Sequence, residues 1–353
     1  MDNPKQAIQY FKKALEIQPQ ANSLHYQLAM SYRHLEKLEI ARQHLQKHGL
    51  VQPSFHDPIM ENLRELKTGK QFFWSQGSIA LSEGKYTKAV ESFRKMLKAD
   101  PNEPLAHMDL GTSLLQLGDV SGALNEYQRA LDLSSGNPRL HYNLGLVYTL
   151  QNSYSKALEH YRRAINLDPE LEEAHFNAAN LLMRMKNQRE AKQHYAKVIA
   201  LNPSDTFARF MQAMASIRMG GYQDAQSLLE ESRRAFPKDL DITHALARLL
   251  AASPDKQFRN GPLALKLLQE IFNTGQEVIG FEHIETLAMA FAETRQFEKA
   301  LQIQQTMIQE ISQTGRNDLV KLLEENLYLY QNGQTCQNPG EMMIQFFLRS
   351  LEA

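Results

Sequence analysis

Side-chain amides and large, mostly aromatic residues recur at a fixed distance along this chain. Asn143 and Asn177 lie 34 residues apart, and Asp109 holds the same position one period earlier. The residue just before this position is large in five successive periods: Trp74, Met108, Tyr142, Phe176 and Phe210. An amide offers both a hydrogen-bond donor and an acceptor, and an aromatic ring adds apolar contact area. Side chains of these types could contact an extended chain regardless of that chain's own side chains.

Arginines follow a related spacing. Arg184 and Arg218 are 34 residues apart, and Arg248 lies about one period further along. On successive structural units these side chains would form a basic patch beside the amides. A guanidinium group binds carboxylate or phosphate groups through two parallel N–H donors. Ordinary solvated charge on helix surfaces explains the same residues, so both interpretations stay open.

Histidines also recur in phase, at His107, His141 and His175 and again at His160 and His194. Residues one period apart would sit on helices whose axes are about 8–10 Å apart. Zinc holds its nitrogen ligands at about 2.0–2.1 Å, which such a ladder meets poorly. We therefore expect the histidines to fill a bulky slot between helices, and no metal site is predicted.

Catalytic patterns are missing from the sequence. It contains no G-x-S-x-G, phosphate-binding loop, H-E-x-x-H or C-x-x-C pattern. The single cysteine, Cys336, lies in a polar stretch with no neighbouring feature that would lower its pKa. We predict no catalytic residue and no cofactor, and a protein that is not an enzyme.

The elements that must position these residues follow the same 34-residue period. Five alanines keep it without a slip: Ala89, Ala123, Ala157, Ala191 and Ala225. Four residues after each alanine stands a large apolar or aromatic residue: Phe93, Tyr127, Tyr161, Tyr195 and Leu229. Twelve residues before each alanine stands a small one: Gly77, Gly111, Gly145, Ala179 and Ala213. A period in this range indicates a solenoid of repeated units, here pairs of helices whose small residues allow close approach. An all-α fold is predicted.

One unit carries a complete set of landmarks: His141-x2-Leu144-Gly145-x2-Tyr148, then Ala157-x3-Tyr161, then Pro169. This pattern resembles the tetratricopeptide repeat family, with His in the slot that often holds Trp. The resemblance implies a right-handed α-solenoid of tandem 34-residue helix-turn-helix repeats, whose first helices line a concave groove.

The resemblance also bears on the candidate site. The series Asp109, Asn143 and Asn177 resembles the asparagine ladder in the repeat region of O-linked N-acetylglucosamine transferase, where amides bind a peptide backbone. The sequence Tyr-Asn-Leu-Gly is also a common form of this repeat, so a purely structural role is the alternative. The carboxylate clamp of chaperone-binding members needs a lysine where this chain has Tyr142, Phe176 or Phe210, so that specificity is not expected.

Breaks in the period divide the chain. We expect a half repeat plus one repeat over 4–53, a spacer helix over 54–69 and five contiguous repeats over 70–237. Two divergent repeats should follow over 238–313, with a loop insertion at 251–263, and then a capping helix over 314–333. The tail, 334–353, should contain an amphipathic helix at 340–352 that covers the cap, with self-association through this helix as an alternative.

Composition limits the remaining classes. A net charge of −1 and a sequence pI near 6.9 argue against a nucleic-acid partner. No apolar run reaches about 18 residues, so no membrane span is predicted. The compartment stays open: cytoplasmic if Met1 is the true start, and periplasmic or secreted if an upstream export segment is missing.

These features favour one function. We expect a non-enzymatic scaffold that binds an extended peptide or protein segment in its concave groove through Trp74, Asp109, Tyr142, Asn143, Phe176, Asn177, Arg184, Phe210 and Arg218. The alternative is the substrate-recognition arm of a longer enzyme whose catalytic domain lies upstream of this chain.

Overall fold

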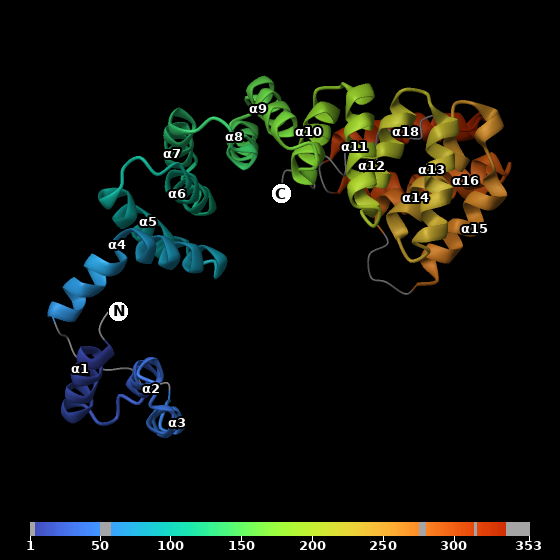
Figure 1. The fold of residues 1–353 in the computed structure, drawn as a ribbon. Helices are drawn as coiled ribbons and strands as arrows, with labels where there is room; N and C mark the ends of the chain where they lie inside the picture. The colour runs from blue at the N-terminus through green and yellow to red at the C-terminus, as the bar shows by residue number, and fades with distance from the viewer. Residues whose placement is uncertain (1–3, 50–57, 275–279, 314–315, 337–353) are drawn as a thin grey trace. The chain divides into compact units, whose positions relative to one another are not determined.

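The computed structural model describes residues 4–49, 58–274, 280–313 and 316–336 (Figure 1). In these ranges every regular element is a helix and there is no strand, which confirms the all-α repeat fold. The chain divides into two compact units, Met1–Ser75 and Gln76–Ala353. None of the helices in the described ranges is both long enough and apolar enough to span a membrane.

The first unit contains α1 (Pro4–Ile17), α2 (Leu24–His34) and α3 (Leu38–Gln46). Ile8 forms a core cluster with Leu28 and Tyr32, against which Phe11 packs. Phe11 holds the aromatic position of a second helix, yet it is only half-buried. The reason is that the described residues include no first helix to complete this pair.

Helix α4 (Pro58–Ser82) begins in the first unit and ends in the second. The sequence predicted a separate spacer helix that ends before residue 70, and α4 instead runs for 25 residues without a break. Pro58 is the first residue of the helix, and no later proline interrupts it. The surplus residues therefore lengthen a helix of the repeat array.

In the second unit, each helix from α5 to α18 packs against its successor. The regular part consists of α5 (Tyr86–Ala99), α6 (Pro104–Gln116), α7 (Val120–Leu133), α8 (Pro138–Leu150), α9 (Tyr154–Leu167), α10 (Glu172–Arg184), α11 (Gln188–Leu201), α12 (Thr206–Arg218) and α13 (Tyr222–Ala235). Figure 1 shows α6 to α13 following one another as successive pairs. The first helices hold the predicted amide and aromatic series, with Asp109 on α6, Asn143 on α8 and Asn177 on α10.

The five in-phase alanines form the centre of these pairs, and all are completely buried. In three of these pairs the aromatic ring that follows the alanine reaches across to a glycine of the first helix: Phe93 to Gly77, Tyr127 to Gly111 and Tyr161 to Gly145. An added Cβ on Gly145 would lie 2.4 Å from Cε1 of Tyr161, and one on Gly111 would lie 2.7 Å from Cε1 of Tyr127. Glycine is thus required because the ring occupies the space of a side chain.

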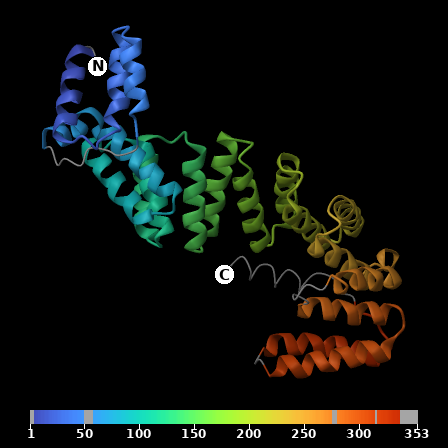
Figure 2. The ribbon, with the colours of Figure 1, turned by 90° about the horizontal axis from the view of Figure 1, so that it is seen from below.

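The C-terminal part contains α14 (Leu240–Ala252), the 3-10 turn η1 (Lys256–Phe258), α15 (Gly261–Phe272), α16 (Phe281–Glu293), α17 (Phe297–Ser312) and α18 (Asn317–Gln331). The predicted insertion at 251–263 spans the end of α14, η1 and the start of α15. α18 lies within the stretch 314–333 that was predicted to form a capping helix, and it packs on α17 (Figure 2). The tail helix expected at 340–352 lies outside the described residues.

The contact between Gly145 and Tyr161 gives a direct test of the packing. Overpacking a core costs about 1–3 kcal/mol, whereas Ala in place of Gly contributes ~1 kcal/mol to a helix. Because Tyr161 is 1% exposed and a Cβ on Gly145 would lie 2.4 Å from its ring, we expect the overpacking to outweigh the helix gain and Gly145→Ala to lower the free energy of unfolding by up to about 2 kcal/mol. Urea denaturation followed by circular dichroism measures this change.

The matched control is Gly136→Ala, because no atom lies within 4 Å of a Cβ placed there. This variant should be close to neutral. Equal stability of the two variants would contradict the packing account.

Candidate functional site

The amide and aromatic register lies on the first helices of successive pairs. Tyr142 and Asn143 are half-buried on α8, and Phe176 and Asn177 are half-buried on α10. The residues on either side of both pairs are buried in the core. Helix geometry therefore turns these four side chains toward one partly exposed face. We call this set the amide ladder.

Each amide of the ladder donates to the preceding first helix. Nδ2 of Asn143 lies 3.4 Å from Oγ1 of Thr112 on α6, and Nδ2 of Asn177 lies 3.1 Å from the hydroxyl of Tyr142 on α8. Asn177 also donates to the carbonyl oxygen of Glu173 at 3.0 Å. The ladder is therefore a series of hydrogen bonds that joins α6, α8 and α10.

The donors of the two amides are thus engaged, whereas their oxygens are not. No hydrogen bond from the described residues reaches Oδ1 of Asn143 or Oδ1 of Asn177. Burial raises the pKa of the Tyr142 hydroxyl, which keeps its own proton while it accepts from Asn177. The surface offers two amide oxygens and one hydroxyl to a ligand.

An aromatic cluster continues the ladder onto α12, but through a different residue from the one predicted. Phe210 is 1% exposed and lies in the core, so its assignment to the groove is wrong. Phe207, one helical turn earlier on α12, is half-buried and its ring centroid is 5.8 Å from that of Phe176. Spacing of three residues on one helix face is the signal that could have identified Phe207.

Two other predicted binding residues, Asp109 and Trp74, are not part of the ladder. Asp109 is half-buried on α6. Burial raises the pKa of the Tyr127 hydroxyl to about 12, and the negative charge of Asp109 adds to this shift. Thr112, one turn further on α6, makes the contact with the ladder. Trp74 is 41% exposed on α4 and belongs to the first unit, whereas the ladder belongs to the second.

The predicted arginine series divides into two kinds of environment. Arg184 and Arg218 are half-buried at the ends of α10 and α12. The guanidinium carbon of Arg184 lies 5.3 Å from the ring centroid of Tyr154, in a cation–π contact. Arg248 is 2% exposed, so its assignment to an exposed basic patch is wrong.

Arg248 instead forms a buried ion pair. Its Nη1 donates to Oε2 of Glu285 on α16 at 2.7 Å and to Oγ1 of Thr286 at 3.1 Å. Asn326 on α18 donates to the other oxygen of Glu285 at 3.3 Å. These polar side chains of α14, α16 and α18 are buried, whereas the ladder residues of α8 and α10 are partly exposed. A single arginine in the otherwise apolar stretch 245–252 is the sequence signal for this pairing.

The in-phase histidines occupy the slot between helices, as predicted. His107, His141 and His175 are 4%, 3% and 7% exposed. In the described ranges no group of three or more His, Cys, Asp or Glu side chains could hold a metal ion.

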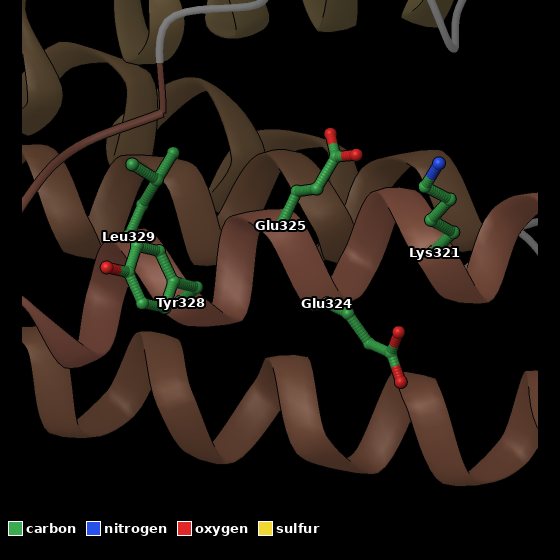
Figure 3. Close-up of a pocket in the computed structure, with 5 residues that line it drawn as sticks. All are labelled: Lys321, Glu324, Glu325, Tyr328 and Leu329. Atoms are coloured by element: carbon green, nitrogen blue, oxygen red, sulfur yellow. The ribbon is translucent and has the colours of Figure 1, made fainter.

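A shallow depression lies on α18 (Figure 3). Its lining residues all come from this one helix: Lys321, Glu324, Glu325, Tyr328 and Leu329. Figure 3 shows Glu324 and Glu325 pointing to different sides of the helix, so their carboxylates do not converge. This depression therefore has no second wall and no set of converging polar groups for a small-molecule ligand.

Comparison with known proteins agrees with the architecture. Three family models match segments of the chain, and each is described as a tetratricopeptide repeat. The matched residues are 108–172, 172–205, and 1–20 together with 71–103. No curated protein matches the sequence.

The chain is similar to solved structures of low sequence identity. A structure from a functional characterisation of Pseudomonas aeruginosa pilF is 21% identical, with a TM-score of 0.51, over 63% of this chain and 98% of that one. A tetratricopeptide repeat protein from Parabacteroides merdae ATCC 43184 is 19% identical, with a TM-score of 0.49, over 75% of this chain and 99% of that one.

The pairing of Arg248 with Glu285 can be tested by stability measurements. Removing one partner leaves an uncompensated buried charge, so we expect Arg248→Met to cost about 3–5 kcal/mol. Replacing both partners, in Arg248→Met with Glu285→Leu, should recover most of that loss because no charge stays buried. Urea denaturation of both single variants and the double variant gives the coupling energy. Additive effects of the two single variants would contradict the direct pairing.

Proposed function

Because this chain is a tetratricopeptide repeat protein, we propose that it is a non-enzymatic scaffold that binds an extended peptide or a segment of another protein. The binding surface is the amide ladder on α8 and α10, with Thr112 on α6 and Phe207 on α12 at its two ends. The observation that carries this proposal is the half-buried pair Asn143 and Asn177, whose amide oxygens accept no hydrogen bond within the described residues.

The amides suit a peptide backbone for a geometric reason. Their Nδ2 atoms are fixed by Thr112 and by Tyr142, which orients each Oδ1 before a ligand arrives. Backbone N–H groups of an extended chain are donors that do not depend on its side chains. Preorganised acceptors lower the cost of ordering on binding. The ladder can thus bind segments of varied sequence.

The aromatic cluster supplies the apolar part of the surface. Phe176 lies between Phe207 and Tyr195, with ring centroids 5.8 Å and 6.3 Å away. Phe207 also packs on the buried Phe210 at 6.3 Å. These rings are held by the core, so a ligand side chain that contacts Phe176 or Phe207 meets a rigid apolar surface.

Arg184 and Arg218 extend the surface with positive charge. They end α10 and α12, and Arg184 is positioned by its contact with Tyr154. A guanidinium binds carboxylates well, so we propose that the preferred segments carry acidic residues beside the part that contacts the amides.

Removing both ladder amides tests the backbone contacts. The probe is a peptide selected from a random-sequence display library against the intact chain. Each net hydrogen bond is worth about 0.5–1.5 kcal/mol, so we expect Asn143→Ala with Asn177→Ala to weaken its binding by about 5- to 150-fold. Isothermal titration calorimetry measures the affinity, and circular dichroism should show unchanged helicity.

The matched control replaces two exposed amides on second helices, in Gln128→Ala with Gln223→Ala. It should bind the probe as the parent chain does. Unchanged binding by the Asn143 and Asn177 variant, with the fold intact, would show that these amides serve repeat packing alone.

Salt dependence tests the arginines. Raising the salt concentration from about 0.1 M to 1 M shortens the Debye length from ~10 Å to ~3 Å. We expect an acidic probe peptide to bind more weakly at high salt, and Arg184→Gln with Arg218→Gln to remove most of that dependence. Arg94→Gln with Lys98→Gln on α5 is the charge-matched control. An affinity that does not change with salt concentration would show that the arginines do not contribute to binding.

A further inference from the structure

Imidazole rings contact each other through Nδ1 atoms within three helix pairs. The distances between the Nδ1 atoms are 2.9 Å for His25 and His44, 3.1 Å for His141 and His160, and 2.9 Å for His175 and His194. In every case one ring comes from the first helix and the other from the second helix of the same pair, 19 residues later. The last two pairs lie next to the ladder, because His141 directly precedes Tyr142.

Backbone carbonyl groups fix the protonation of the first ring. Nε2 of His141 is 3.1 Å from the carbonyl oxygen of Ser135. A carbonyl oxygen only accepts, so this Nε2 carries a hydrogen and Nδ1 of the neutral ring carries a lone pair. His160 must then donate through its Nδ1–H. The second pair has the same arrangement, with Nε2 of His175 3.2 Å from the carbonyl oxygen of Pro169.

This N–H···N bond survives only while at least one ring is neutral. Once both rings are protonated, each Nδ1 carries a hydrogen, so two donors and two positive charges face each other. The first proton is disfavoured as well, because burial lowers the pKa of His160 to about 4. Burial is also the main cause that lowers the pKa of His141, His175 and His194.

The surrounding charges do not reverse this preference. Arg163 and Glu159 on α9 face the first pair, and they act on the pKa in opposite directions. Lys197 and Glu190 on α11 and Arg162 on α9 face the second pair. The carboxylate of Glu190 is itself paired with Arg162 at 2.6 Å, which weakens its support for a histidine cation.

One helix pair of the same array has a carboxylate in place of the second imidazole. Oε2 of Glu126 lies 2.6 Å from Nδ1 of His107, and Nε2 of His107 lies 2.9 Å from the carbonyl oxygen of Pro101. A protonated His107 satisfies both acceptors, so acid does not oppose this pair. Arg129 lies 3.7 Å from the other oxygen of Glu126, in the position that Arg163 holds relative to His160.

We propose that His141–His160 and His175–His194 are acid-sensitive latches that hold together the helix pairs α8–α9 and α10–α11. At neutral pH each latch is closed by one hydrogen bond between neutral rings, and double protonation opens it. Because these helix pairs carry Tyr142, Asn143, Phe176 and Asn177, opening would also disturb the ladder. That last consequence, the release of a bound peptide in acid, rests on the proposed function. The latches themselves need no ligand.

The pH range follows from the direction of the shifts. A group whose pKa is lower in the folded than in the unfolded protein stabilises the fold at high pH and loses that effect as the pH falls. For His160 the loss extends from its ordinary value of 6.5 down to about 4. Each histidine that only the unfolded chain protonates changes the opening equilibrium about tenfold per pH unit.

The principal test converts one latch into the His–Glu pair that the chain already contains. His160→Glu places a carboxylate beside His141, with Arg163 where Arg129 stands in the natural pair. Protection factors from amide hydrogen exchange, measured without ligand between about pH 7 and pH 5, report the opening of α8 and α9. We expect the protection factors of α8 and α9 to fall in acid in the parent protein. In His160→Glu we expect this fall to be smaller by about a factor of ten per pH unit.

The control is His34→Glu, which makes the same substitution at an exposed histidine of the first unit. It should keep the full acid response of α8 and α9. An equal response in His160→Glu and the control would overturn the latch. The readout involves no peptide, so failure of the proposed binding function would leave this result unchanged.

Nitrogen-15 NMR of the parent protein gives a second measurement that does not depend on a variant folding. We expect the Nε2–H tautomer for His141 and the Nδ1–H tautomer for His160 at neutral pH. The same tautomer on both rings, or titration of both at the ordinary pKa, would overturn the proposal.

Discussion

The close approach of Gly145 to the ring of Tyr161, repeated in register along the second unit, is the contact on which the rest depends. A ring that fills the space of a missing side chain sets how near two helices of a pair can come. The neighbouring alanines, all completely buried, hold the same spacing from the other side. Because small and large residues keep this register along the regular part, residues 34 positions apart occupy equivalent places on successive helices. A ladder of side chains is a consequence of that regularity.

The surface changes character along the array while the backbone repeats. On α8 and α10 the register positions hold amides and half-buried aromatic rings, and the amides tie each first helix to the one before it. On α14 and α16 the corresponding face holds Arg248 and Glu285, which are buried with Asn326 of α18. The same fold therefore offers a polar, partly exposed surface at its centre and an internal polar network near its C-terminal end.

Sequence periodicity predicted the helices because small and aromatic residues at fixed spacing have one packing solution. The cap α18 and the buried histidine slots were also predicted. Phe210 and Arg248 were placed wrongly because exposure on a first helix depends on how the next helices pack, and the period does not encode this. The spacer helix was expected to end, yet α4 continues because its residues contain no stop signal. The partners of His141 and His175 lie 19 residues away on the second helix, and the 34-residue period does not relate these positions to each other.

The central claim is that a peptide binds to the amide oxygens of the ladder. The most direct measurement is NMR of the asparagine side-chain amides in selectively labelled protein, recorded while a peptide that binds the protein is added. The account predicts shifts at Asn143 and Asn177, whereas an exposed amide outside the ladder, Asn273, stays unchanged. Saturable binding that leaves both ladder amides unshifted and moves only residues of the second helices would contradict it.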